Sequence, residues 1–305
     1  MRESFQNHVG INITTSKLQV VEVSYLNGEF ILENVNEEYF SEFLDFNSKK
    51  TKIISLLQRA FNEMALDRTL KTRYYSFTLP HNLFKMVQLP IENSLLDSDL
   101  VEHFRWEYSV LFPDLKQEEL LLQFIKTEDN EPSAIISGTL KRYIDILKEF
   151  CTLYNANLKY VDNVHFASDN LLQLETGILD NSFILSLYLS NDYLSIDLLQ
   201  NYKPVRFLAI PLKQSSEIIQ FIDTFIKTNE LLNGDIKLIS RVYISGDSIL
   251  DSLVSNLENA FDFDVYSINP FNKIKHSPSL KQNNAFYSES NSFASAAGIA
   301  FRLIY

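Results

Sequence analysis

Two short polar turns carry the residues of this chain that could bind phosphate. The first turn holds Thr14, Thr15, Ser16 and Lys17, which offer hydroxyl groups, backbone amides and one positive charge. Backbone amides arranged in a turn form concave sites that hold anions, and hydroxyl groups and cations add to them. The first turn is therefore a candidate for one side of a phosphate site.

A second polar turn holds Ser190 and Asp192, and Gly246 ends a later apolar run. A phosphate turn needs glycine, because glycine lets the backbone approach the ligand closely. The chain has only seven glycines, and Gly10 is the one near the first turn. The turns have two interpretations: residual nucleotide binding with little or no hydrolysis, or ordinary hairpin turns without nucleotide. We favour the second interpretation.

No other pattern indicates catalysis or a metal site. The five histidines are scattered, without the spacing of paired metal ligands. Neither a Walker loop nor a Gly-x-Ser-x-Gly elbow occurs. The single cysteine, Cys151, lies on an apolar helical stripe over 140–154, which predicts a core residue. We expect no catalytic residue, no metal site and no cofactor, with Mg-ATP the one ligand left open.

The composition predicts a globular cytoplasmic protein. Hydrophobic residues make up 46% of the chain and charged residues 22%, as in globular domains. The net charge of -12 argues against nucleic acid or anionic lipid as the main partner. The sequence opens with no apolar signal region, and no run approaches the roughly 20 apolar residues that span a bilayer. Membrane contact is therefore expected only through a partner.

The residues that could bind phosphate must be positioned by strands, and the pattern of strands occurs twice. The first copy has predicted strands at 9–14, 18–25, 30–35 and 74–79 and a predicted helix at 53–64. Asn27-Gly28 predicts a hairpin within it. The same order returns over 183–244, about 176 residues later. A repeat at this scale predicts two related lobes with a cleft between them.

An insertion with its own α+β pattern lies between the two copies. Its predicted elements are strands at 86–90, 119–125 and 134–138 and helices at 96–111 and 140–154. We assign 1–80 together with 161–180 to the first lobe, 81–160 to the inserted α+β subdomain, and 181–305 to the second lobe.

Several strings, in their order along the chain, resemble the PilM group of actin-like proteins, relatives of the cell-division protein FtsA. The hairpin from Val9 to Val23 resembles the opening phosphate hairpin of that group. The other strings are Leu89-Pro90, Arg105-Trp106-Glu107, Phe112-Pro113, Val161-Asp162, Phe166-Ala167, Ser245-Gly246-Asp247, Asn269-Pro270-Phe271 and residues 297–302. The resemblance covers nearly the whole chain. It implies an α/β fold of the actin-like (ribonuclease H-like) type, duplicated into two lobes, with an inserted α+β subdomain.

The phosphate turns depart from the pattern of that group. Asn12 stands in place of an aspartate and Thr14 in place of a glycine. In the second turn Tyr188 takes the aspartate position and Ser190 the glycine position. A residual nucleotide site would use Gly10, Asn12, Thr14, Thr15, Ser16, Lys17, Ser190, Asp192 and Gly246. The resemblance with these departures implies a pseudo-ATPase.

The resemblance also implies a scaffold role in type IV pilus or type II secretion assembly. PilM-type proteins lie at the cytoplasmic face of the inner membrane and bind the cytoplasmic N-terminal tail of a PilN-like bitopic protein, beside other platform proteins. The implied docking groove lies near residues 81–125. Its candidate contacts are Arg105, Trp106 and Tyr108, since arginine and aromatic residues are enriched at binding hot spots. Packing onto the sheet of the insertion is the alternative for Trp106.

Two other functions stay open. An active actin-like ATPase, which binds Mg-ATP and switches or polymerises, would depend on Gly10, residues 14–17 and Asp192. A relative of sugar or acetate kinases would need a catalytic aspartate at the second turn, where none is obvious.

Overall fold

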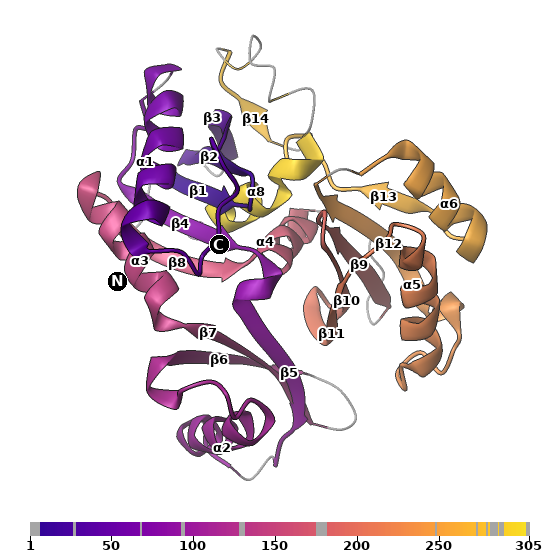
Figure 1. Ribbon diagram of the computed structural model, residues 1–305. Coiled ribbons are helices and arrows are strands. Elements are labelled where there is room, and N and C mark those ends of the chain that lie inside the picture. The colour runs from indigo at the N-terminus through magenta and orange to yellow at the C-terminus, as the bar shows by residue number, and fades with distance from the viewer. Residues whose placement is uncertain are drawn as a thin grey trace.

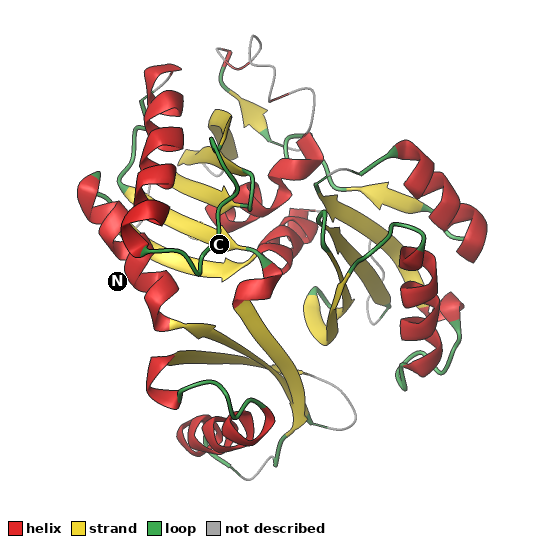
Figure 2. Ribbon diagram, viewed as in Figure 1, coloured by secondary structure: helices red, strands yellow, loops and turns green. Residues whose placement is uncertain are grey.

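The expected α/β fold of two lobes with an inserted subdomain is confirmed (Figure 1). The computed structural model describes residues 7–26, 29–67, 69–92, 95–127, 132–174, 182–247, 249–272, 274–278, 280, 286 and 290–302. Each lobe is built on one sheet, with helices on its outer side and helices between the lobes (Figure 2). Within these residues no helix is both long and apolar enough to cross a membrane.

The first lobe has a six-stranded sheet in the order β14-β3-β2-β1-β4-β8. Its strands are β1 (Asn7–Ile13), β2 (Lys17–Leu26), β3 (Glu29–Tyr39), β4 (Tyr74–Leu79), β8 (Asn157–Asn163) and β14 (Lys275–His276). Helices α1 (Lys50–Asp67) and α3 (Lys141–Leu153) cover its outer face. Leu26 pairs with Glu29, which confirms the predicted hairpin, although Asn27-Gly28 lies outside the described residues.

The second lobe has a five-stranded sheet in the order β11-β10-β9-β12-β13. Its strands are β9 (Phe183–Leu189), β10 (Tyr193–Gln200), β11 (Lys203–Pro211), β12 (Ile239–Gly246) and β13 (Val265–Ser267). Helices α5 (Glu217–Thr228) and α6 (Asp251–Phe261) pack on its outer face. In both lobes the first strand pairs antiparallel with the next strand and parallel with the strand after the helix. This shared pairing supports the duplication inferred from the repeat.

Two short helices lie between the two sheets (Figure 1). They are α4 (Val164–Asp169) and α8 (Ala294–Phe301). Both lie against β1 or β9, and α8 is buried along its whole length, as the small apolar residues of that segment predict. Side chains alternate along a strand, so Val9, Ile11 and Ile13 of β1 face the outer core. Gly10 and Asn12, at the alternate positions, face the interlobe helices. Polar side chains such as Asn12 therefore point toward the second lobe.

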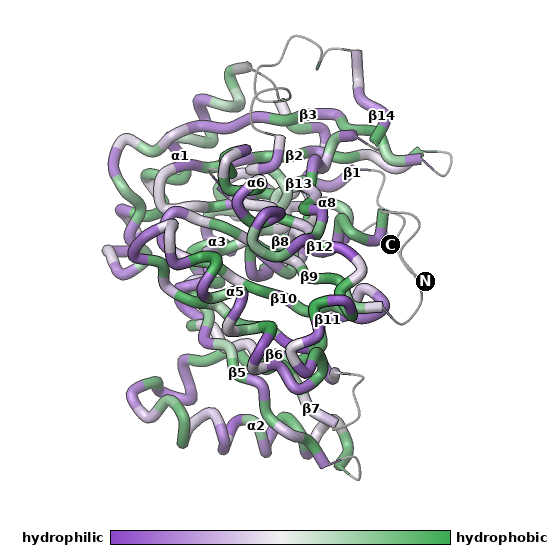
Figure 3. The backbone as a smooth tube through the Cα atoms, turned by 90° about the vertical axis from the view of Figure 1, so that its right-hand side faces the viewer, coloured by the Kyte–Doolittle hydropathy of each residue, from purple (hydrophilic) through white to green (hydrophobic). Residues whose placement is uncertain are grey.

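The inserted subdomain is a three-stranded sheet in the order β5-β7-β6 with one helix. Its elements are β5 (Phe84–Pro90), α2 (Asp97–Leu111), β6 (Leu120–Thr127) and β7 (Ser133–Leu140). Hydrophobic and hydrophilic stretches alternate along α2 (Figure 3), and Leu100 and Phe104 from its apolar face fill the core of the subdomain. Packing of this face against the sheet holds the subdomain together.

Three whole elements, and the start of strand β8 at Asn157, join the first lobe from ranges assigned to other parts of the chain. Helix α3 lies in the range 81–160, and its Phe150 and Cys151 belong to the core shared with α1 and β1. Strand β14 and helix α8 lie in the range 181–305, and they pair with β3 and pack on β1 and β2. Cys151 is 2% exposed, and burial raises the pKa of its thiol to about 12, which fits the predicted core role.

Candidate functional site

Three backbone amides of the first phosphate-like turn are hydrogen bonded within the turn. Thr14 N donates to Lys17 O at 3.0 Å, and the Thr14 hydroxyl oxygen accepts from Ser16 N at 3.2 Å and Lys17 N at 3.0 Å. A glycine at position 14 would supply no such hydroxyl. The threonine side chain thus occupies amides that a phosphate would need.

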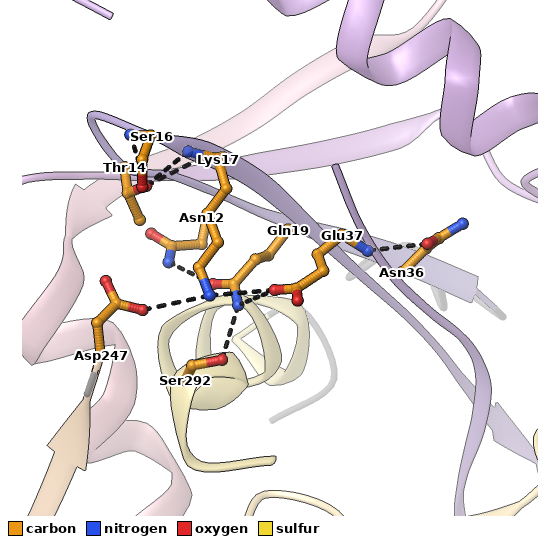
Figure 4. Close-up of polar contacts among 9 residues, drawn as sticks. All are labelled: Asn12, Thr14, Ser16, Lys17, Gln19, Asn36, Glu37, Asp247 and Ser292. Atoms are coloured by element: carbon orange, nitrogen blue, oxygen red, sulfur yellow. Dashed lines mark hydrogen bonds and ion pairs between the residues drawn. The ribbon is translucent and has the colours of Figure 1, made fainter. Parts of the chain in front are cut away.

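Lys17 joins the two lobes through buried charges (Figure 4). Its side chain is 6% exposed, and its Nζ lies 3.1 Å from Glu37 Oε2 in β3 and 3.6 Å from Asp247 Oδ1, just after β12. Burial alone would lower the pKa of Lys17, but Asp247 and Glu37 outweigh it and raise that pKa. The lysine therefore serves as a charged link between the lobes.

The amide of Asn12 is used within the first lobe. Asn12 Nδ2 donates to Gln19 Oε1 at 2.9 Å, and Thr78 Oγ1 donates to Asn12 Oδ1 at 2.8 Å. Gln19 Nε2 donates in turn to Ser292 Oγ at 2.8 Å and Glu37 Oε2 at 3.1 Å. Both polar atoms of the Asn12 side chain are therefore hydrogen bonded, at the position where the resemblance would place a metal-binding aspartate.

Tyr188 occupies the matching position in the second lobe. Asn12 is the cross-strand partner of Gln19, and Tyr188 is that of Ser195. Tyr188 is 2% exposed, so its ring fills space on the interlobe face of β9. Burial, with Asp247 nearby, raises the pKa of its phenol, which keeps the ring neutral.

The second turn lines a cavity of about 470 Å³ in the second lobe. Ser190 and Asn191 lie on one side of it and Asp247 on another. Ser190 Oγ donates to Asp192 Oδ1 at 3.2 Å, so this carboxylate interacts locally within its own turn. None of the residues of the first turn lines this cavity.

Gly10 and Gly246 both have packing reasons to be glycine. A Cβ at Gly10 would lie 1.9 Å from Ala296 O in α8. Gly246 has φ +120, and a Cβ there would lie 2.0 Å from Leu189 O. At both glycines the missing Cβ allows one stretch of backbone to approach another closely.

A groove of about 790 Å³ is lined by residues of neither polar turn. We call it the three-way groove because the inserted subdomain, the first lobe and the second lobe all line it. Its lining includes 121–125 of β6, 158–162 of β8 and Asp197 of β10. β6 and β8 are both edge strands of their sheets.

Two aspartates lie together in the lining of the three-way groove. Asp169, at the end of α4, and Asp197, in β10, both lie beside Ser186, which donates to Asp169 Oδ1 at 2.5 Å and is the cross-strand partner of Asp197. Asp197 is 0% exposed, and neither of its carboxylate oxygens accepts a hydrogen bond from the described residues. Burial raises the pKa of Asp169 to about 7, and burial with the nearby Asp169 raises that of Asp197.

The Asp169–Asp197 pair was not predicted from the sequence, although the position of Asp197 within a strand is one sign of it. Asp197 is a charged residue within the strand Tyr193–Gln200, whose other central positions are apolar or small. Such a residue needs a partner when it is buried. Its partner Asp169 is 28 positions away in the sequence and comes from a different element, so the sequence contains no spacing signal.

The three predicted partner contacts on α2 do not line the three-way groove, whereas Val101 of that helix does. Tyr108 is fully buried, and its hydroxyl donates to Lys85 O at 3.0 Å. Trp106 is 62% exposed, and its ring stacks near His103. Arg105 lies 3.8 Å from Glu102. Tyr108 is thus a core residue, while Arg105 and Trp106 lie on the surface of α2.

Comparison with known proteins supports the fold. No protein-family model and no curated protein matches the chain. Among solved structures, a chain of the "PilM-PilN type IV pilus biogenesis complex" matches with a TM-score of 0.74 and 18% identity, covering 98% of each chain.

Two further structures are more distant. A Bacteroides thetaiotaomicron protein with "actin-like ATPase fold and unknown function" matches with a TM-score of 0.52 and 15% identity, over 88% of this chain and 93% of that one. The ethanolamine utilization protein EutJ from Carboxydothermus hydrogenoformans matches with a TM-score of 0.51 and 7% identity, over 98% and 91%. The chain therefore has an actin-like fold, and it is PilM-like in that fold along nearly its whole length.

Proposed function

We propose that the chain is a scaffold of a pilus or secretion assembly platform and binds the cytoplasmic N-terminal peptide of a PilN-like bitopic membrane protein. The observation that carries this proposal is the three-way groove, which two edge strands flank. An edge strand presents unpaired backbone groups to which an extended peptide can add. The similar fold in the PilM-PilN complex supports the choice of partner.

The side chains of β6 fit a peptide-binding wall. Leu121, Gln123 and Ile125 alternate with residues that face the core of the subdomain, and all three line the groove. Leu121 and Ile125 are each 39% exposed. Their apolar surface would be covered by alternate side chains of an added strand.

In this proposal the scaffold lies at the cytoplasmic face of the inner membrane, held there by its partner. The net charge of -12 fits attachment through a protein rather than through anionic lipid. Other platform proteins would bind to surfaces outside the groove.

We further propose that the protein works without hydrolysing ATP. Three features support this: the occupied amides of the first turn, the Lys17–Asp247 ion pair, and Tyr188 at the position of an aspartate. Calorimetry with Mg-ATP tests the proposal. Micromolar binding with turnover would establish the alternative, an actin-like ATPase that switches or polymerises.

The peptide proposal is tested by fluorescence anisotropy with labelled synthetic tails of bitopic membrane proteins encoded beside this chain. We expect one tail to bind, and Leu121→Asp to weaken it at least about tenfold, because a charge replaces apolar contact surface. Leu238→Asp is the matched control, since Leu238 is 42% exposed and lies in the second lobe away from the groove. Equal weakening by both variants, or no binding of any tail, would overturn the proposal.

A further inference from the structure

We propose that Asp169 and Asp197 form a cation subsite in the three-way groove, which takes a positively charged N–H group of the bound peptide. A lysine ammonium, an arginine guanidinium or a terminal amine has this chemistry. The inference rests on the proposed function, because it names what the peptide places at one end of the groove. The observation behind it is that both carboxyl groups lie beside Ser186 in the lining of a peptide-sized groove.

Strand geometry fixes Asp197 on the interlobe face of β10. Ser186 of β9 is its direct cross-strand partner, and Ser195 lies two residues earlier on the same face. Helix α4 packs against this face and ends at Asp169, one turn after His165. The carboxyl groups are thus held by a strand and a helix rather than by loops.

A chain of buried hydrogen bonds leads to Asp169. His81 and His165 both contact Ser195 Oγ, at 2.8 Å from His81 Nε2 and 2.7 Å from His165 Nδ1. His165 Nε2 then contacts Ser186 Oγ at 3.0 Å, and Ser186 Oγ donates to Asp169 Oδ1 at 2.5 Å. This series of hydrogen bonds therefore alternates between strands of the second lobe, which supply Ser195 and Ser186, and residues outside that lobe.

Only one assignment of donors and acceptors satisfies every hydrogen bond in this series. Asn163 Oδ1 accepts from His165 N, so Asn163 Nδ2 is free to donate to His81 Nδ1 at 3.0 Å. His81 then carries its proton on Nε2 and donates to Ser195, which donates to His165 Nδ1. His165 likewise carries its proton on Nε2. Both imidazoles are neutral in this arrangement, and burial lowers the pKa of each.

Three carboxylate oxygens remain without a donor. Asp169 Oδ1 accepts the hydrogen bond from Ser186 Oγ. Asp169 Oδ2 and both oxygens of Asp197 accept no hydrogen bond from the described residues. A buried carboxylate without donors is strongly disfavoured, so the pair must hold a proton or a cation. An ammonium group has three donors, and a guanidinium has a planar fork that suits paired carboxylates.

A peptide cation fits these groups better than a metal ion does. The described residues contain no group of three or more His, Cys, Asp or Glu side chains that could hold a metal. His165 is close to Asp169, at 3.6 Å from Nε2 to Oδ1, but both of its ring nitrogens are used in the chain. Two carboxyl groups without a third ligand make a poor metal site.

Other charges in the groove lie on neighbouring elements. Lys148 comes from α3, Lys159 and Asp162 from β8, and Arg302 follows α8. Arg302 forms an ion pair with Asp162, and His165 of α4 is neutral. Tyr202 lines the groove as well. The cation and the proton compete for the same oxygens of the pair, so cation binding should strengthen as the pH rises from 6 to 8.

The first experiment needs no knowledge of the partner. The full chain, with ¹³C-labelled aspartate, is titrated with N-acetyl-lysine amide and N-acetyl-arginine amide, and with N-acetyl-norleucine amide as the neutral control. We expect at least one cationic probe to shift the Asp169 and Asp197 carboxyl signals with at least about fivefold higher affinity than the neutral probe. We expect this preference to disappear in Asp197→Asn, whose amide keeps the shape of the side chain.

Asp114→Asn is the matched control, because Asp114 is exposed and lies outside the groove. Circular dichroism and Asp169→Asn check that any loss is not a failure to fold. Equal shifts with all three probes, no shift with either cation, or an unchanged preference in Asp197→Asn would overturn the inference. The same shifts with K⁺ or Mg²⁺ alone would also overturn it, because the site would then take inorganic cations.

The second experiment separates this inference from the proposed function. In a tail peptide that binds the groove, each Lys or Arg is replaced by norleucine and the terminal amine is acetylated. We expect one replacement to weaken binding at least about tenfold, and its identity distinguishes side chain from terminus. If the peptide binds and no replacement matters, the cation subsite is wrong while the proposed function stands. If no tail binds, the proposed function fails, and the small probes still decide the subsite.

Discussion

Lys17 Nζ lies 3.6 Å from Asp247 Oδ1, so an ion pair connects the first lobe to the second. The pair links the first phosphate-like turn to the residue that follows β12. It also makes the charge of Lys17 a determinant of stability.

Replacement of Lys17 by Met is expected to destabilise the fold by about 3 kcal/mol, because it leaves Glu37 and Asp247 as poorly compensated buried charges. Urea unfolding at pH 7 measures this loss. The double variant Lys17→Met/Glu37→Gln should recover part of it, since one orphan charge is removed. A loss below about 0.5 kcal/mol in the single variant would contradict the structural role.

The same lysine predicts a loss of stability in alkaline solution. Because the folded-state pKa of Lys17 is raised, its contribution is complete below the unfolded pKa and is lost as the pH rises through the folded pKa. Wild type should therefore lose more stability than Lys17→Met on going from pH 9 to pH 11. Parallel urea-midpoint curves for the two proteins would show that the lysine carries no such linkage.

The Asp169–Asp197 pair predicts a loss of stability in the same direction, but at lower pH, between about 4 and 7. The folded protein binds the proton more tightly than the unfolded chain, so this contribution to stability falls as the pH rises from about 4 toward 7. Asp197→Asn should be about 1–2 kcal/mol more stable than wild type at pH 8, because its amide can donate to Asp169. The gain should shrink at pH 5. The exposed Asp114→Asn serves as the control, and an equal gain at both pH values would contradict the shared proton.

The buried histidines should stay neutral in acid. Burial lowers the pKa of His81 to about 3 and of His8 to about 4. Folding stability then falls as the pH drops below about 6.5, by about 1.4 kcal/mol per pH unit for each such imidazole, because the unfolded chain binds the protons. NMR of ¹⁵N-labelled histidine should show unchanged Nε2-protonated His81 and His165 from pH 7.5 to 5. Titration of either ring in that range would contradict the directed chain.

Two glycines with positive φ provide a matched pair for testing backbone crowding. Gly246→Ala is expected to cost about 3 kcal/mol, since its Cβ would lie 2.0 Å from Leu189 O in addition to the strained φ. Gly234→Ala should cost only about 1 kcal/mol, because nothing lies within 4 Å of its Cβ. Thermal unfolding of both variants measures the difference, and similar losses would show that φ alone matters.

The sequence predicted most strands and helices because their patterns are local. Alternating apolar residues marked β1 and β9, and helical spacing marked α1 and α5. The predicted turn at Thr14 and the turn at Ser190 also have matching hydrogen bonds, Thr14 N to Lys17 O and Ser190 N to Tyr193 O. Whether those turns bind nucleotide stays a prediction.

The sequence by itself determined the duplicated α/β pattern, the insertion and the poverty of glycine in the phosphate-like turns, because each depends on residues close together in the chain. Only the tertiary structure decided where α8 packs, that Lys17 meets Asp247, and that Asp169 meets Asp197. These contacts join residues far apart in the sequence, and their energies arise from burial, which removes water from charged groups. The spacing of residues along the sequence does not show which charged groups become buried together.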